Sequence, residues 1–247
     1  MNRTRLAWAV AALLASVAVA AAPEPTVNKI VADYVAARGG VAKIRSVQTL
    51  RQTGRASTGG GREAAVTREL KRPGKSRFEL TVQGMTAVYV VNAGTGWRVS
   101  PFEEGLQAQP LEDDAVAEAM EQVDFEGPLV DWKAKGHRVE LAGREPALGR
   151  DAYKLKVTLG SGDVRYDYID VKTHRHVRTD ATRTVRGRAV RLEMTFADHA
   201  KTGGILFPRT VEVAAEGRPQ RLRIVVDTIE VNPPISDARF ERSSRAP

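Results

Sequence analysis

The residues Leu70-Lys71-Arg72-Pro73-Gly74-Lys75-Ser76-Arg77-Phe78-Glu79-Leu80 decide the fold, together with the sequence that continues to Pro101. Polar and apolar residues alternate on both sides of Pro73-Gly74, which is a turn sequence. A third alternating segment follows, and Gly94-Thr95-Gly96-Trp97 leads into a fourth that ends at Ser100-Pro101. Successive strands joined by tight turns pair as antiparallel neighbours. The stretch therefore predicts an antiparallel meander.

The same period of two runs through most of the chain. It predicts strands at 47–57, 63–71, 76–83, 86–93 and 96–100, and again at 153–159, 163–170, 190–196, 205–214 and 220–231. So many strands with one apolar face each curl into a barrel or split into a sandwich. Few helices are available to cover an open sheet. We therefore expect a mainly β (α+β) fold, in which an incomplete antiparallel barrel wraps around its own helices.

Two segments depart from this alternation. Residues 27–44 carry apolar side chains at a helical spacing, interrupted by Gly39-Gly40. Residues 102–135 predict an insertion that lies over the sheet. Within it, Asp113-Asp114 begins a short helix, and acidic residues gather here although the chain as a whole is basic. The apolar residues of this insertion include Val116, Met120, Val123, Phe125 and Trp132.

The N-terminus has the pattern of a secretory signal peptide. Arg3 and Arg5 precede an apolar run from Leu6 to Val19, and small residues follow. We predict a signal peptide at 1–20 and a single domain at 21–247, with the insertion at about 102–135. The chain has no cysteine, which excludes disulfides, thiol catalysis and the lipid-modified cysteine of a bacterial lipoprotein. The expected location is the periplasm.

Charge and motifs argue against nucleic-acid binding and catalysis. The net charge is +8, or 8 − 2 = +6 without Arg3 and Arg5, and the arginines are scattered along predicted strands. Export makes nucleic acid an unsuitable partner, so anionic lipid head groups are the better match. Gly160-Ser161-Gly162 lies between two predicted strands and not between a strand and a helix, so it is a hairpin loop and not a nucleophile elbow. No residue is predicted to be catalytic, and we expect no enzyme.

Histidine spacing raises one possible metal site. His174 and His176 are two residues apart and would share a face of a strand. No third ligand is implied nearby, so a solvated strand face is the preferred interpretation. We predict no metal and no cofactor.

Several signals in order resemble the LolA family of periplasmic lipoprotein carriers. They are Lys71-Arg72-Pro73, the aromatic Phe78, the strand 86–92, Gly94-Thr95-Gly96-Trp97 and Ser100-Pro101. The chain also resembles LolA-like outer-membrane lipoprotein-sorting proteins. That likeness rests on Ala37-Arg38-Gly39-Gly40, Gly127-Pro128-Leu129-Val130-Asp131, Gly203-Gly204-Ile205-Leu206-Phe207-Pro208 and Asn232-Pro233-Pro234. The resemblance covers roughly residues 27–241.

The resemblance implies an incomplete barrel with a helical lid and a hydrophobic cavity between them. It implies that Arg72 is a latch to the lid in the closed, empty state. One candidate for the lid is 113–132, with the lid residues Val116, Met120, Val123, Phe125 and Trp132. From the alternation alone, we predict a concave face that includes Phe78, Leu80, Leu155, Val157, Leu192, Met194 and Phe196.

The expected function is a monomeric periplasmic carrier of lipid acyl chains. Such carriers take lipoproteins from an inner-membrane donor and pass them to an outer-membrane acceptor. The cargo is a lipoprotein or, because the insertion departs from LolA, another lipid or a glycolipid. The alternatives are a sensor or regulator similar to RseB, which acts through a protein partner, and a structural factor of the cell envelope.

Overall fold

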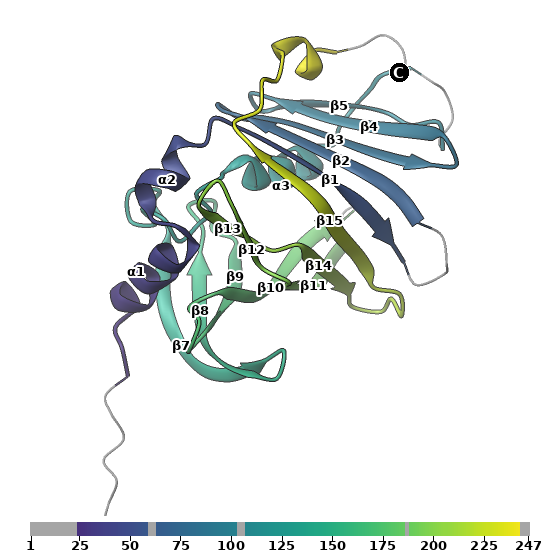
Figure 1. Ribbon diagram of the computed structural model, residues 1–247. Helices are drawn as coiled ribbons and strands as arrows, with labels where there is room; N and C mark the ends of the chain where they lie inside the picture. Colours follow the sequence, from purple (N-terminus) through teal and green to yellow (C-terminus); the bar gives the residue numbers. More distant parts are fainter. Residues whose placement is uncertain (1–23, 59–62, 103–106, 186–187, 243–247) are drawn as a thin grey trace, which may run out of the picture.

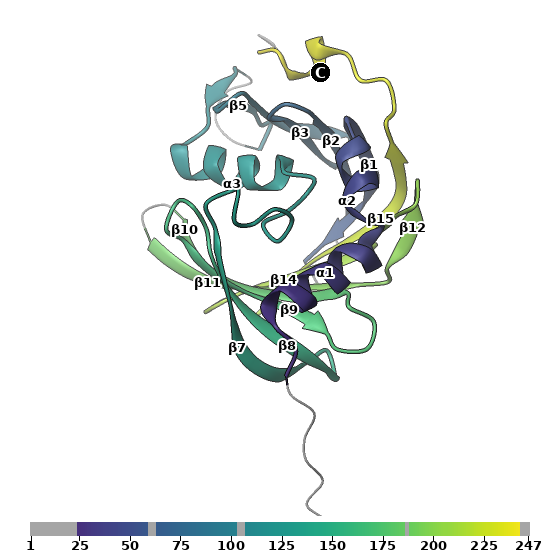
Figure 2. The same ribbon diagram turned by 90° about the vertical axis from the view of Figure 1, so that its left-hand side faces the viewer.

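A computed structural model describes residues 24–58, 63–102, 107–185 and 188–242. The predicted signal peptide lies outside the described residues. Among these residues, thirteen strands form one antiparallel sheet in the order β6-β5-β4-β3-β2-β1-β15-β14-β11-β10-β9-β8-β7. The sheet curves around its helices without closing (Figure 1, Figure 2). The predicted mainly β, incomplete barrel is confirmed.

The N-terminal wing of the sheet is the predicted meander. Its strands are β1 (Thr49–Ser57), β2 (Glu63–Lys71), β3 (Lys75–Val82), β4 (Met85–Asn92), β5 (Thr95–Val99) and the short β6 (Gln109–Pro110). Each strand pairs antiparallel with the next. Since the turns are tight, the register follows directly from the alternation, and Arg68, Phe78 and Tyr89 lie side by side on one face.

The second wing carries the longer strands of the C-terminal half. These are β7 (Arg138–Ala147), β8 (Arg150–Thr158), β9 (Val164–Asp170), β10 (His176–Val185), β11 (Arg188–Ala197), β14 (Thr210–Ala215) and β15 (Leu222–Val231). A separate hairpin consists of β12 (Ala200–Thr202) and β13 (Ile205–Phe207). The strand predicted at 205–214 is therefore wrong as one element. Pro208 divides it, because proline has no N–H to donate to a ladder, and the two parts belong to different sheets.

Helices occupy the inside of the curve. They are α1 (Val27–Arg38), α2 (Val41–Ser46) and α3 (Asp113–Val123). A 3₁₀ turn η1 (Asp237–Phe240) near the C-terminus lies on the other face of the sheet. α1 ends at Gly39, where φ is 130° and a Cβ would lie 2.5 Å from the carbonyl oxygen of Gly204. Only glycine suits both this backbone angle and this close approach to the β12–β13 hairpin. Gly39 thus fixes where the end of α1 meets the β12–β13 hairpin.

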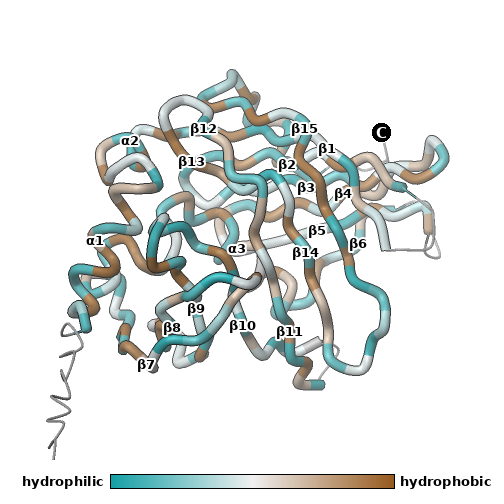
Figure 3. Tube along the Cα trace, turned by 60° about the horizontal axis from the view of Figure 1, so that its bottom comes forward, coloured by the Kyte–Doolittle hydropathy of each residue, from teal (hydrophilic) through white to brown (hydrophobic). Residues whose placement is uncertain are grey.

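Hydrophobic and hydrophilic residues alternate along many of the strands (Figure 3). Buried apolar clusters lie on both faces of the sheet. On the inner face, α1 and the 127–132 loop pack on β7–β9 around Leu155, Val157 and Ile169. A second inner cluster joins Val123 and Phe125 to β1, β2 and β15. On the outer face, Ile235 and Phe240 of the C-terminal segment cover β4 and β5. The C-terminal segment therefore leaves the inner face to the helices.

Candidate functional site

The segment 113–136, made of α3 and the loop after it, lies inside the curve of the sheet (Figure 2). α3 approaches β5 so closely that a Cβ on Gly96 would meet Val116 Cγ2 at 3.0 Å. The Met120 methyl group lies 3.3 Å from where a Cβ of Gly74 would be. These glycines give α3 room against the meander. We call residues 113–136 the covering segment.

The five predicted lid residues all lie on the covering segment. Val116 and Met120 face β5 and the β2–β3 turn, Val123 and Phe125 are buried in the second inner cluster, and Trp132 packs against the cluster around α1. Their role as a lid remains a prediction. The geometry shows that the segment is packed onto the concave face by apolar contacts.

Arg72 contacts this segment, and its role as a latch, which the resemblance implied, remains a prediction. Its Nε donates to the carbonyl oxygen of Val47 at 2.8 Å, and its Nη2 lies 3.5 Å from Glu126 Oε1. The guanidinium also stands 5.0 Å from the centre of the Phe125 ring. Arg72 therefore contacts two consecutive residues of the covering segment, Phe125 and Glu126.

Glu126 is the centre of a larger cationic clamp. Its side chain is 15% exposed, and besides Arg72 it has Arg45 Nε at 3.9 Å and Lys135 Nζ at 3.7 Å. Arg38 donates to the main-chain carbonyls of Phe125 and Glu126. These cations come from α1, α2, the β2–β3 turn and the segment itself. The loop is therefore held to three separate elements by charge-assisted bonds.

Two further arginines hold the end of α3 and join the two wings. Arg68 of β2 donates to the carbonyl oxygen of Gln122 at 2.9 Å, and Arg183 of β10 pairs with Glu121 Oε2 at 2.5 Å. Burial lowers the pKa of Arg68 to about 10, which still leaves it charged at neutral pH. Sequence reasoning missed these partners. The signal was present in the acidic residues concentrated in 112–126 of a basic chain.

The predicted cavity residues all belong to the face of the sheet that carries the helices, but they differ in access. Leu155 and Val157 are completely buried under α1 and the loop, so a ligand reaches them only if these move. Phe78, Leu80, Leu192 and Met194 are partly exposed. Phe196 lines an inner cavity of about 240 Å³. Contact with a ligand remains a prediction for each of them.

The floor of this inner cavity is a buried ionic network. Asp167 Oδ1 accepts from Arg165 Nη2 at 2.8 Å and from Thr179 Oγ1 at 2.8 Å. His176 Nε2 lies 2.9 Å from the same hydroxyl and 3.4 Å from Asp167. Burial raises the pKa of Asp167, but the charge of Arg165 and the hydrogen bonds with His176 and Thr179 outweigh it and hold the pKa below its ordinary value. Asp167 is therefore ionised.

The prediction that His174 and His176 share a solvated strand face is wrong. His174 precedes β10 with φ 55°, and only His176 is in the strand. A β-bulge between His176 and Arg178 turns the next two residues to the outer face, so His176 points inward against the Phe196 ring, with 4.6 Å between ring centres. In the described parts of the chain, no three His, Cys, Asp or Glu residues are placed to hold a metal ion.

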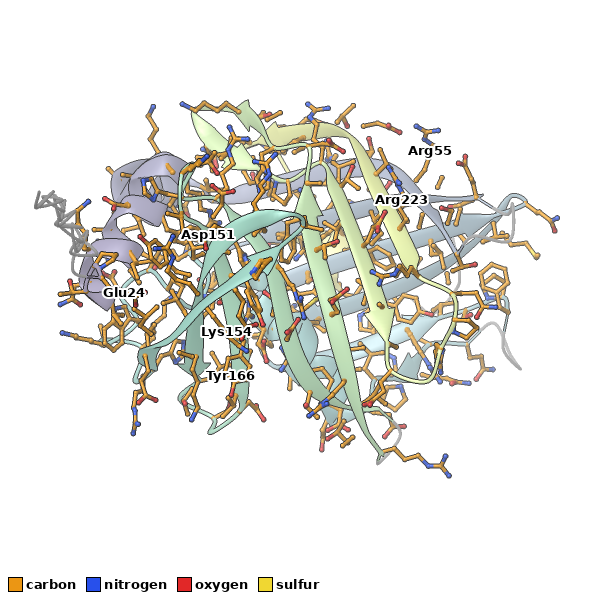
Figure 4. All side chains as sticks on the ribbon, turned by 90° about the horizontal axis from the view of Figure 1, so that it is seen from below. Glu24, Arg55, Asp151, Lys154, Tyr166 and Arg223 are labelled. Atoms are coloured by element: carbon orange, nitrogen blue, oxygen red, sulfur yellow. The ribbon has the colours of Figure 1, made fainter. Side chains whose placement is uncertain are left out.

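A larger hollow of about 530 Å³ lies on the outer face of β8–β11 and β14, near Lys154 and Tyr166 (Figure 4). Its charges largely satisfy one another. Arg178 pairs with Asp180 at 2.6 Å and with Glu193 at 3.2 Å, and the Lys154 ammonium stands 4.9 Å from the Tyr166 ring centre. Because its charges are paired and its form is open, this hollow is a polar surface groove.

Comparison with solved structures identifies the architecture. A DUF1329 family protein from Desulfovibrio piger has a TM-score of 0.60 at 16% identity, covering 89% of this chain and 99% of that one. A putative outer membrane lipoprotein-sorting protein domain from Vibrio parahaemolyticus gives 0.59 at 11%, with 87% and 97% covered. A LolA superfamily protein from Nitrosomonas europaea gives 0.56 at 11%, with 88% and 98% covered. This chain has the LolA-like fold.

The likeness to the LolA-like fold is one of structure. No protein-family model matches the sequence, and no curated protein matches it either. Among the described residues, no helix is long and apolar enough to cross a membrane. The predicted resemblance is thus confirmed for the fold, over nearly the whole length of the solved neighbours.

His199 also lines the inner cavity, and the pH dependence of stability at this residue is testable. Burial lowers the pKa of His199, and the nearby charge of Arg175 lowers it further. The folded state then binds fewer protons than the unfolded state, so stability falls as the pH drops through the ordinary histidine pKa of about 6.5. We expect an NMR titration midpoint for His199 below 6.5, and a smaller loss of Tm between pH 7.5 and 5.5 in His199→Gln. A midpoint at or above 6.5 would contradict the assignment.

Proposed function

We propose that this protein is a periplasmic carrier that binds lipid acyl chains on its concave face and passes them toward the outer membrane. It acts as a monomer between a membrane donor and an acceptor and does no chemistry on its cargo. The observation that carries the proposal is the covering segment, which is fastened by a set of arginines over a largely apolar face. The LolA-like fold supports it, since one solved neighbour is described as a lipoprotein-sorting domain.

The clamp supplies a physical reason for an opening and closing cycle. An empty apolar cavity loses packing contacts, so a structure without cargo is better filled by its own segment. The inner cavity of about 240 Å³ is smaller than the roughly 300–1,000 Å³ of typical ligand pockets. Acyl chains therefore require the covering segment to move away from the sheet. Charge-assisted bonds of roughly 1.5–3 kcal/mol each set the free energy of that movement.

A fluorescent fatty-acyl probe tests the carrier on delipidated protein. Met194 lies on the predicted concave stripe of β11, whereas Val164 lies on the opposite face at the start of β9. We expect Met194→Glu to weaken probe binding at least tenfold, because a carboxylate on this face must be desolvated against the acyl chain. The matched Val164→Glu variant should bind like the wild type.

Circular dichroism and melting curves show whether each variant is folded, and Leu192→Glu provides a second position on the same stripe. Lipid extraction from freshly purified protein, followed by mass spectrometry, identifies the natural cargo. Failure of the wild type to bind the probe, with no lipid recovered, would exclude a carrier. A stable protein partner together with no lipid exchange would favour the regulator instead.

A further inference from the structure

The inner cavity has more positive charge than its own residues neutralise. Arg38, Arg165 and Arg175 line it, and Asp167 is the one carboxylate among the lining residues, so the balance is 3 − 1 = +2 with neutral histidines. Arg165 is committed to Asp167, and Arg38 to two main-chain carbonyls. Within the described ranges, the side chain of Arg175 makes no ion pair or hydrogen bond. One guanidinium at this cavity is therefore available to a ligand.

His174, which also lines the cavity, has a ring nitrogen that is unpaired within the described part of the chain. Its Nδ1 is buried and, among the described residues, has no hydrogen-bond partner. A turn holds the residue in the left-handed region, with φ 55°. In this turn the His174 N–H donates to the main-chain carbonyl oxygen of Asp170 at 2.9 Å. Buried polar atoms are nearly always paired in native proteins, so this nitrogen retains an unused hydrogen-bonding capacity beside the cavity.

The apolar side of the cavity continues into the proposed acyl-binding face. Phe196, Leu206, Phe207 and Leu129 form its apolar walls. Phe196 is followed along the same face of β11 by Met194 and Leu192. The register places Val211 and Val213 of β14 beside Phe196 and Met194. A chain lying on this stripe would therefore bring its end to the mouth of a cationic cavity.

We propose that this cavity binds the phosphate group of an anionic lipid whose acyl chain lies along β11. The inference rests on the proposed carrier function and specifies the head group of its cargo. Phosphate matches the planar donor fork of arginine, and its oxygens accept from several donors at once. About 240 Å³ accommodates a head group, while the chain remains outside on the stripe. Arg175 provides the charge, His174 a further polar contact, and Phe196 the connection to the chain.

Isothermal titration of the full mature chain at fixed salt tests the proposal. The probes are lysophosphatidylglycerol, a monoacylglycerol with the same acyl chain and no phosphate, both below their micelle concentrations, and inorganic phosphate. We expect the anionic lipid to bind at least tenfold more tightly than the uncharged one. Arg175→Gln should remove this preference and leave monoacylglycerol binding unchanged. The matched control is Arg191→Gln, on the exposed outer face, which should keep the preference.

Inorganic phosphate separates the two sources of the anion. Competition by phosphate against the anionic lipid, but not against the uncharged one, supports a site for the phosphate group. Equal affinity for both lipids in the wild type, or a preference that survives Arg175→Gln, overturns the head-group site and leaves the carrier intact. No binding of either lipid overturns the carrier and this inference with it.

Discussion

Asp167→Asn is expected to lower the free energy of unfolding by about 3–5 kcal/mol, the cost of breaking a buried ion pair by removing one partner. Asp167 is 1% exposed and accepts from Arg165 and Thr179. The substitution keeps the shape of the side chain but leaves the buried guanidinium of Arg165 without its counter-charge. Urea denaturation followed by circular dichroism measures the change.

Glu140→Gln provides a matched control. Arg138 and Glu140 have the same two-residue spacing on a strand, with 2.7 Å between their charged atoms, but both are exposed to solvent. Loss of this exposed ion pair should leave the free energy of unfolding unchanged, because exposed pairs are screened by water.

The lowered pKa of Asp167 gives a second readout. The stability that ionised Asp167 contributes is present above the ordinary aspartate pKa of about 4 and is lost as the pH falls below it. In a plot of the free energy of unfolding against pH, Asp167→Asn should therefore flatten the acidic part. Equal stability of Asp167→Asn and the wild type would show that the network does not hold the wall of the cavity.

Glu126→Gln is expected to tighten the binding of an acyl probe about tenfold and to slow its release. Removing the charge weakens the contacts with Arg72, Arg45 and Lys135 and destabilises the closed, empty state. The apparent affinity rises as the open state becomes more populated, and about 1.4 kcal/mol corresponds to tenfold. Equilibrium titration of the probe measures its affinity, and stopped-flow release into acceptor vesicles measures its release rate.

Arg72→Leu should act in the same direction, and the double variant should show less than the sum of the two effects, because both remove one interaction. Asp237→Asn is the control, since this carboxylate also contacts two cations, Lys71 at 3.1 Å and Lys75 at 2.6 Å, but lies outside the concave face. Unchanged release kinetics in both Glu126→Gln and Arg72→Leu would exclude a latch at this position.

The sequence was sufficient for the elements whose pattern is local. Strand alternation and the turns at Pro73-Gly74 and Gly94 placed β1 to β5 within about two residues, and Gly39-Gly40 separated α1 from α2. The insertion and its apolar residues were also evident. The split at Pro208 was overlooked because the apolar alternation continues across the proline, although proline cannot take part in a central ladder.

The candidate site was less accessible to sequence reasoning. Arg72 was found through its resemblance to a carrier motif, but its partner Glu126 lies 54 residues away and Arg38 lies 88 residues from the same glutamate. No spacing rule connects residues that far apart. The bulge at His176 reversed the orientation expected from simple alternation, so the inward network of Asp167, His176 and Thr179 was not foreseen.

The sequence by itself determined an antiparallel sheet of alternating strands, an acidic insertion and the absence of recognisable catalytic motifs. These properties depend on period, turn chemistry and composition, which are local and additive along the chain. Only the tertiary structure decided that the insertion lies inside the curve, that arginines from four elements of the chain hold it there, and that a cationic cavity adjoins the apolar stripe. Those features depend on sheet curvature and on long-range register, because a strand's alternation specifies its two faces but not what the opposite wing brings against them.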